Sequence, residues 1–220
     1  MRSITRLLIV LLVTASSTLA MADREVKTKD FSGWMKDYDS LKYNEERNAF
    51  LFFNEAKRGV YNKILLEKVV IYSEDGVAAG EIAEESSAYL SKGLAAMLAS
   101  RGVAASEAGP DVLRLKLAIT AVEKSKEDLK AYNFVPVAAV FRGAQAATGN
   151  VSTYIDAMFE AEMVDSVSGD RVAATVAKGI EETEKRSGDA LTFDDVKPTL
   201  DKWIAQYGKT LDGYLAKRKK

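Results

Sequence analysis

The sequence contains no histidine and no cysteine among its 220 residues. The absence of histidine excludes Ser–His–Asp and Cys–His nucleophile systems, and the two absences together exclude zinc sites built from histidine or thiolate ligands. An exported form of this chain must also fold without disulfides, and it has no cysteine to carry a lipid. Carboxylate, lysine, tyrosine and Ser–Lys chemistry remains available, as do hard cations bound by oxygen. We therefore expect a protein that is not an enzyme and that uses no cofactor and no metal.

An excess of positive charge is also missing, because 31 Lys and Arg residues stand against 32 Asp and Glu residues, for a net charge of −1. Nucleic-acid-binding domains normally carry a basic excess, so we expect no nucleic-acid partner. The sequence lacks a glycine-rich phosphate loop, a dinucleotide fingerprint and a Ser-x-x-Lys motif. We interpret the basic residues 217–220 as a solvated helix end, with contact to anionic lipid or a polyanion as the alternative.

No apolar run approaches the roughly 20 residues that a membrane-spanning helix needs. The N-terminus instead has Arg2 and Arg6, a short apolar run over residues 7–13, and the small residues Ala20 and Ala22. This arrangement predicts a secretory signal peptide over residues 1–22, cleaved after Ala22. A retained anchor is the alternative, and membrane contact is expected only through such an uncleaved segment. We therefore expect an exported protein, periplasmic or associated with the envelope.

Hydrophobic periodicity in the rest of the chain predicts one α/β domain with α+β character. We expect an extended N-terminal segment over residues 23–48, followed by the domain over residues 49–220. The domain should hold a mixed sheet of about four to five strands. The elements predicted before residue 124 are strands at 49–53, 64–72 and 111–123 and a helix at 80–101.

The strand at 64–72 is mostly apolar, which is typical of a central strand buried on both sides. The order strand, helix, strand over residues 64–123 predicts a parallel crossover. A last helix is marked by apolar residues at steps of three and four, with Asp195 as its N-cap and Pro198 in its first turn.

Residues 152–178 predict a β-hairpin around which the domain is organised. Every odd position over 155–163 is apolar, and the even positions are mixed and largely polar, so one face should pack on a core and the other face water. The turn at 165–170 holds Gly169, which is free to adopt positive φ. We expect the odd face to be covered by the last helix or by the helix at 80–101.

Three carboxylates, Asp156, Glu160 and Glu162, share the even face of this hairpin. Neighbours two residues apart would lie about 7 Å from each other, within the range of an inverting glycosidase pair. Acidic residues alternating outward are also what a solvated strand face shows, and we favour that interpretation. Asp165 and Asp170 could wrap Ca²⁺, but their spacing misses the EF-hand pattern and a hairpin turn explains them better.

Two other stretches hold candidate partner contacts, namely Phe31, Trp34, Tyr38, Phe141 and Arg142. The first three are the aromatic residues of the stretch 31–42, which we interpret as a tether whose rings plug the domain surface, with a binding motif as the alternative. The last two lie in residues 134–150, which are small and almost uncharged. Packing within the domain is favoured there over the close approach of a partner.

Several blocks together resemble the bacterial family called domain of unknown function 3313. They are FSGWMKDYDSLK, LRLKLAITAVE, VPVAAVFRGAQAATGN, EAEMVDSVSGDRVAA and the last helix with Val196, Leu200 and Trp203. The resemblance covers residues 31–217 and implies an exported envelope protein, often a lipoprotein, with no established activity or catalytic residues. This chain departs from the pattern by lacking the lipobox cysteine. The element order is also similar to small periplasmic α/β domains such as the amino-terminal domain of the Tol-system propeller protein.

The combined hypothesis is a non-enzymatic exported protein of the cell envelope, a periplasmic accessory or binding protein. Its partner would be an envelope protein or a cell-wall component, and the sequence does not define its oligomeric state. Two alternatives stay open. One is a carboxylate-dependent saccharide hydrolase that uses Asp156, Glu160 and Glu162, and the other is a carrier of a small apolar ligand held under residues 134–150.

Overall fold

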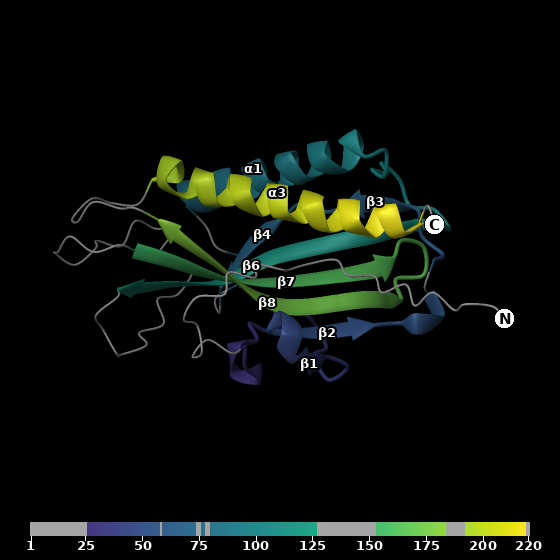
Figure 1. The fold of residues 1–220 in the computed structure, drawn as a ribbon, viewed down its shortest axis with the longest axis horizontal. Helices are drawn as coiled ribbons and strands as arrows, with labels where there is room; N and C mark the ends of the chain where they lie inside the picture. Colours follow the sequence, from purple (N-terminus) through teal and green to yellow (C-terminus); the bar gives the residue numbers. More distant parts are fainter. Residues whose placement is uncertain are drawn as a thin grey trace.

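Three long strands form the middle of the structure, a computed structural model that describes residues 26–57, 59–73, 76–77, 80–126, 153–183 and 192–218. They are β6 (Val112–Lys126), β7 (Thr153–Asp165) and β8 (Arg171–Thr183), and β7 pairs antiparallel with both others. Shorter strands extend the sheet on both sides (Figure 1): β1 (Lys42–Asn44) and β2 (Ala49–Phe53) beside β8, and β3 (Lys63–Leu66), β4 (Val70–Ser73) and β5 (Gly76–Val77) beyond β6.

This mixed sheet and its two helices, α1 (Glu81–Ser100) and α3 (Phe193–Arg218), form a single α+β domain, which confirms the predicted fold class. The sheet has eight strands, more than the four to five expected. The additional ones are short: β1 has three residues and β5 has two, too few for a periodic signal. Three 3₁₀ turns complete the described elements, at Thr28–Asp30, Glu45–Arg47 and Glu55–Lys57.

The predicted single strand at 64–72 is two strands, β3 beside β6 alone and β4 between β6 and β5. Both β3 and β4 run parallel to β6, but Leu66 pairs with Leu115 whereas Val70 pairs with Ala118. The β3–β4 side therefore holds one residue more than the β6 side, and an extra residue interrupts a ladder as a bulge does. The predicted parallel crossover is confirmed, since α1 connects β4 to β6.

Both helices lie side by side over one face of the sheet (Figure 1). Phe159, Ala161 and Met163 of β7 point into this layer, where the ring of Phe159 makes an edge-on contact with Trp203 of α3, with 4.5 Å between centroids. The terminal helix thus covers the apolar face of the hairpin, as predicted. The fully buried members of this core include Ile71, Leu90, Ile119, Leu200 and Leu211.

α3 begins at Phe193, so the prediction of Asp195 as its N-cap was wrong. The ring of Phe193 contacts Tyr89 of α1 with 5.5 Å between centroids, so the first residue of α3 already packs on the other helix. Pro198 therefore lies inside the helix and not in its first turn, as was predicted. In the described part of the chain, neither helix is long and apolar enough to cross a membrane.

Two glycines allow the helices to approach each other closely. A Cβ atom on Gly93 of α1 would lie 2.3 Å from Cδ1 of Ile204, and one on Gly208 of α3 would lie 2.7 Å from an Nη atom of Arg101. Arg101, just after α1, also donates two hydrogen bonds to the carboxylate of Asp212, at 2.7 and 2.8 Å. The glycines that weaken each helix by propensity are needed for the contact between them.

The other face of the sheet is covered by residues 26–41, which we call the N-terminal segment. Its side chains form a second apolar cluster with β2, β7 and β8, in which Val26, Met35 and Leu41 are buried. The even face of β7 was predicted to point toward water, and this prediction was wrong for the described residues at its centre. Glu160, in the middle of that face, has no exposed surface.

Candidate functional site

The most unusual feature of the described residues is a fully buried carboxylate on a central strand. Glu160 of β7 lies beneath the N-terminal segment and accepts two hydrogen bonds from it. The backbone N–H of Ser32 donates to Oε1 at 2.8 Å, and the hydroxyl of Tyr38 donates to Oε2 at 2.5 Å. A buried carboxylate is tolerated only where donors replace water, and here the N-terminal segment supplies them.

Tyr38 connects this carboxylate to the backbone of the same segment. Its hydroxyl oxygen accepts a hydrogen bond from the N–H of Met35 at 3.0 Å while the hydroxyl proton is donated to Glu160. Burial raises the pKa of Tyr38 well above its ordinary value, and the hydrogen bond to Glu160 and its negative charge raise it further. The hydroxyl therefore stays protonated at physiological pH and remains a hydrogen-bond donor.

Glu162, two residues further along β7, is held by two cations. Arg171 at the start of β8 approaches its Oε1 at 2.8 Å, and Nζ of Lys116 on β6 lies 3.3 Å from Oε2. Arg171 also donates to the backbone oxygen of Asp37 at 2.8 Å and to the hydroxyl of Ser40 at 3.2 Å. One guanidinium thus ties the hairpin to the far end of the N-terminal segment.

The three acids of the predicted even face are therefore not an exposed set. Glu160 and Glu162 are both engaged by neighbouring side chains, and neither stands free to protonate a leaving group or activate water. The backbone of Asp156 pairs with Glu123 on β6 and Ile180 on β8, and its side chain lies outside the described residues. Among the described side chains, Glu160 and Glu162 hold chain segments together and form no open acid–base pair.

The aromatic residues predicted as partner contacts partly cover this site. Phe31, Trp34 and Tyr38 are partly buried against the second cluster, and Phe31 stacks on Tyr38 with 4.7 Å between ring centroids. Phe31 also makes an edge-on contact with Phe50 of β2 at 5.0 Å. Whether these rings contact a partner stays a prediction. Phe141 and Arg142 lie outside the described residues.

Two residues of the site were missed at the level of sequence. Arg171 pairs in register with Val164, so it lies diagonally across from Glu162. The hairpin register could therefore have predicted this pair of opposite charges. Asn48, whose side-chain oxygen accepts a hydrogen bond from the N–H of Val26 at 2.9 Å, gave no periodic signal. It sits at φ 45°, a left-handed conformation that asparagine tolerates.

Asp165 in the hairpin turn, one of the two residues weighed as Ca²⁺ ligands, has both carboxylate oxygens engaged in hydrogen bonds. Oδ1 of Asp165 accepts the backbone N–H groups of Val167 and Ser168, and Oδ2 accepts the hydroxyl of Tyr61 at 2.8 Å. These contacts, with the N–H of Ser168 first, lower the pKa of Asp165 to about 2. Among the described residues no three acidic side chains gather as a metal site would require.

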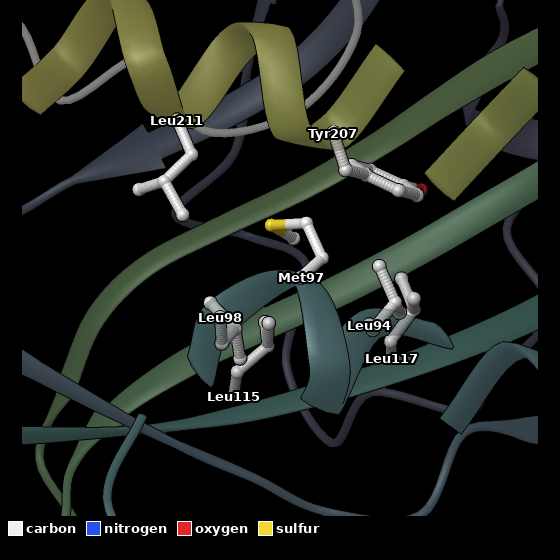
Figure 2. Close-up of a pocket in the computed structure, with 7 residues that line it drawn as sticks. All are labelled: Leu94, Met97, Leu98, Leu115, Leu117, Tyr207 and Leu211. Atoms are coloured by element: carbon white, nitrogen blue, oxygen red, sulfur yellow. The ribbon is translucent and has the colours of Figure 1, made fainter. Parts of the chain in front are cut away.

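A small apolar cavity lies between α1, α3 and β6 (Figure 2). Figure 2 shows Leu94, Met97, Leu98, Leu115, Leu117, Tyr207 and Leu211 around it. Its volume is about 20 Å³, close to the minimum for one water molecule. Burial raises the pKa of Tyr207 far above its ordinary value, in keeping with this dry surrounding. The space is too small for a carried ligand, and residues 134–150, where the carrier hypothesis placed one, lie outside the described residues.

A family model described as "Protein of unknown function (DUF3313)" matches residues 30–207. The chain belongs to the DUF3313 family. This confirms the resemblance drawn from the sequence blocks, and the matched range includes both the N-terminal segment from Asp30 onward and most of α3. The buried Glu160 and the side chains that hold it thus lie within the part of the chain that the DUF3313 model covers.

Two similar proteins are lipoproteins, namely the "Uncharacterized lipoprotein YdcL" of Escherichia coli K12 and that of E. coli O157:H7. Each is 26% identical over 190 residues, covering 82% of this chain and 84% of the relative. Among solved structures, the PelC dodecamer from Paraburkholderia phytofirmans is 12% identical and covers 76% of this chain and 95% of its own, with a TM-score of 0.34. That score is too low to establish a common fold.

Proposed function

We propose that this DUF3313 protein is a non-enzymatic, exported protein of the cell envelope that acts by binding another envelope component. The observation that carries the proposal is the engagement of Glu160 and Glu162 by the N-terminal segment, Lys116 and Arg171. Glu160 and Glu162, two of the three acids that the sequence pattern offered as catalytic, are structural contacts. What remains on this face is a surface with partly buried aromatic rings, a composition common at binding interfaces.

Export is supported by two independent features. The first is the leader-like pattern of residues 1–22, and the second is the lipoprotein character of the YdcL relatives. Because the sequence holds no cysteine, the thioether-linked lipid of a lipoprotein has no attachment point in these 220 residues. We therefore propose a protein released after Ala22, or one anchored by an uncleaved leader, on the outer side of the inner membrane.

Fractionation of a Gram-negative host that expresses the full chain with a C-terminal tag tests this proposal. The expected result is tagged protein in the periplasmic or envelope fraction, with a mass that places Asp23 at the N-terminus. An Ala22→Arg variant should keep its leader and move to the membrane fraction, while Ala15→Arg, within the same leader but away from the cleavage site, is the matched control for cleavage. Wild-type protein found only in the cytoplasm would contradict export.

The hydrolase alternative is tested separately with purified protein. We expect Glu162→Gln and Glu160→Gln variants to be indistinguishable from wild type when each is incubated with cell-wall glycan and the products are separated by mass. Product formation by wild type that both variants lose would overturn the non-enzymatic proposal. The same preparations are checked for folding by circular dichroism, because Glu160 is a buried contact.

A further inference from the structure

We propose that the face of the sheet beneath the N-terminal segment is a peptide-binding site, which residues 26–41 occupy in this structure. A partner envelope protein would displace them with a segment of similar chemistry. This inference rests on the binding function proposed above and names its kind of partner. We call this surface the segment-covered face; its residues are Asn48, Phe50, Phe52, Met158, Glu160, Arg171, Ala174 and Val176.

The N-terminal segment lies on the sheet without joining it as a strand. Within the described residues, its backbone–backbone hydrogen bonds are all local, such as Asp30 to Lys27 and Leu41 to Tyr38. In the part of the chain that the structure describes, no such bond joins it to a strand, so the segment can leave without breaking the ladder of the sheet. This distinguishes it from β1, which follows it in the chain and pairs with β2.

Three side chains of the face contact the main chain of the segment. Asn48 accepts the N–H of Val26, Glu160 accepts the N–H of Ser32, and Arg171 donates to the backbone oxygen of Asp37. Contacts to peptide groups do not depend on which residue carries them. Domains that bind extended peptides commonly combine main-chain hydrogen bonds, which give affinity, with side-chain pockets, which give specificity.

The segment-covered face also determines which side chains an occupant must carry. The segment places Phe31 against Phe50 and stacks it on Tyr38, while Met35 is buried in the same cluster. Tyr38 also supplies the hydroxyl that Glu160 accepts. A competing segment therefore needs an aromatic residue at the Phe31 position, an apolar residue at the Met35 position and a tyrosine at the Tyr38 position.

The tether sets the affinity that a partner must reach. A segment joined to its own domain by a short connection experiences an effective concentration on the order of millimolar. A free peptide therefore binds only weakly while the chain's own segment is intact, and binding becomes measurable once that segment is loosened. Trp34 and Tyr38 belong to the segment and not to the face, so substituting them weakens the occupant without altering the site.

The experiment measures binding of a labelled synthetic peptide of residues 26–41 to the exported protein by fluorescence anisotropy. The protein carries Trp34→Ala and Tyr38→Phe, and we expect it to bind the wild-type peptide at least about tenfold more tightly than the unaltered protein does. Adding Glu160→Ala should weaken binding by about tenfold or more, because the peptide's Ser32 N–H and Tyr38 hydroxyl lose their acceptor. Lys209→Ala, at an exposed position of α3 on the other side of the sheet, is the matched control and should leave binding unchanged.

A peptide with Ser32→Pro tests the main-chain contact directly, since proline lacks the N–H that Glu160 accepts, and it should bind about tenfold more weakly. Equal binding of a scrambled peptide, or no binding to a folded loosened protein, would overturn the proposal. Concentration-dependent dimers that exchange residues 26–41 would overturn it as well, because the occupant would then be a second copy.

If the loosened protein does not fold, hydrogen exchange on the unaltered protein replaces the binding measurement. Excess peptide should accelerate exchange of the Ser32 amide in the protein's own segment while leaving amides of β7 unchanged. Unchanged exchange at Ser32 would overturn the proposal. Such a failure, with the fractionation result intact, would leave the proposed export and non-enzymatic role standing, so the two can be distinguished.

Discussion

The two faces of the sheet are built in different ways from the same three strands. On one face, α1 and α3 pack over an apolar layer in which Phe159 and Trp203 meet edge to face. On the other, an irregular segment covers a smaller apolar cluster with a carboxylate, Glu160, at its centre. Neighbouring residues of β7 thus face opposite environments, one dry and apolar and the other apolar with a polar anchor.

The helix-covered face contributes mainly stability, and the segment-covered face contributes mainly specificity. Apolar burial is non-directional, so the helix-covered face gains free energy in proportion to the area removed from water. The segment-covered face depends on a few directional contacts, since Glu160 and Arg171 must meet their partners in the correct place. We therefore expect substitutions to cost most on the helix-covered face, and substitutions on the other face to release the N-terminal segment.

The largest effect is expected for Phe159→Ala, which removes the ring that packs on Trp203. Replacing a buried phenylalanine with alanine typically costs about 3–5 kcal/mol of unfolding free energy. Urea unfolding followed by tryptophan fluorescence and circular dichroism measures the change. Trp34→Ala on the segment-covered face is the comparison, because Trp34 is only partly buried. An equal cost for the two variants would break the proposed division between the faces.

Glu160→Ala should have the next largest effect, about 2–3 kcal/mol, because the N–H of Ser32 and the hydroxyl of Tyr38 lose their acceptor in a buried place. Glu160→Gln retains one acceptor oxygen and should cost less. Limited proteolysis with trypsin gives the local measure, since Lys36 is exposed in the segment and should be cleaved faster in the Ala variant. Unaltered cleavage with a lowered global stability would show that Glu160 supports the strands and not the segment.

Sequence periodicity predicted the helix-covered face well, for a physical reason. The odd positions of β7 and the apolar stripe of α3 each repeat with the period of their own element, so they could be matched without knowing their contacts. The crossover through α1 followed from element order alone. Boundaries were predicted less closely, since α3 starts at Phe193, whose ring packs on Tyr89 of α1 in a contact that periodicity does not contain.

The segment-covered face could not be predicted in the same way. Glu160 belongs to an acidic face that is identical in pattern to a solvated one, and only a segment more than 100 residues away covers it. The N-terminal segment has no period, since beyond one 3₁₀ turn its backbone is irregular. The sequence identified its rings, Phe31, Trp34 and Tyr38, as surface plugs, but the acceptor beneath them was not recognised.

Gly93→Ala should lower the unfolding free energy by a smaller amount, through the contact between α1 and α3 on the helix-covered face. The new Cβ would lie 2.3 Å from Cδ1 of Ile204, so one helix must shift or the side chain must move. Overpacking costs about 1–3 kcal/mol, and the better helix propensity of alanine offsets about 1 kcal/mol, so we expect a net loss of up to about 2 kcal/mol. A double-mutant cycle with Ile204→Ala should recover part of it. A stabilised Gly93→Ala protein would show that α1 and α3 can move apart freely.

The smallest effect is expected at the turn between β7 and β8, which belongs to neither face. Hydrogen bonds from Ser168, Tyr61 and Val167 hold the folded pKa of Asp165 at about 2, below the value of about 3.9 for an unfolded chain. A lowered folded pKa stabilises the protein above about pH 4, and this contribution is lost as pH falls toward 2. Allowing for water around the turn, we expect about 1 kcal/mol.

Asp165→Asn is the variant that isolates this contribution. It should be less stable than wild type at neutral pH, and the difference between the two proteins should shrink as pH falls from 4 to 2, because only the wild-type side chain titrates there. Unfolding curves in urea at several pH values measure the difference. Asp170→Asn is the control, since Asp170 is an exposed neighbour in the same turn. A constant difference across the window would mean that Asp165 acts through turn geometry and not through its charge.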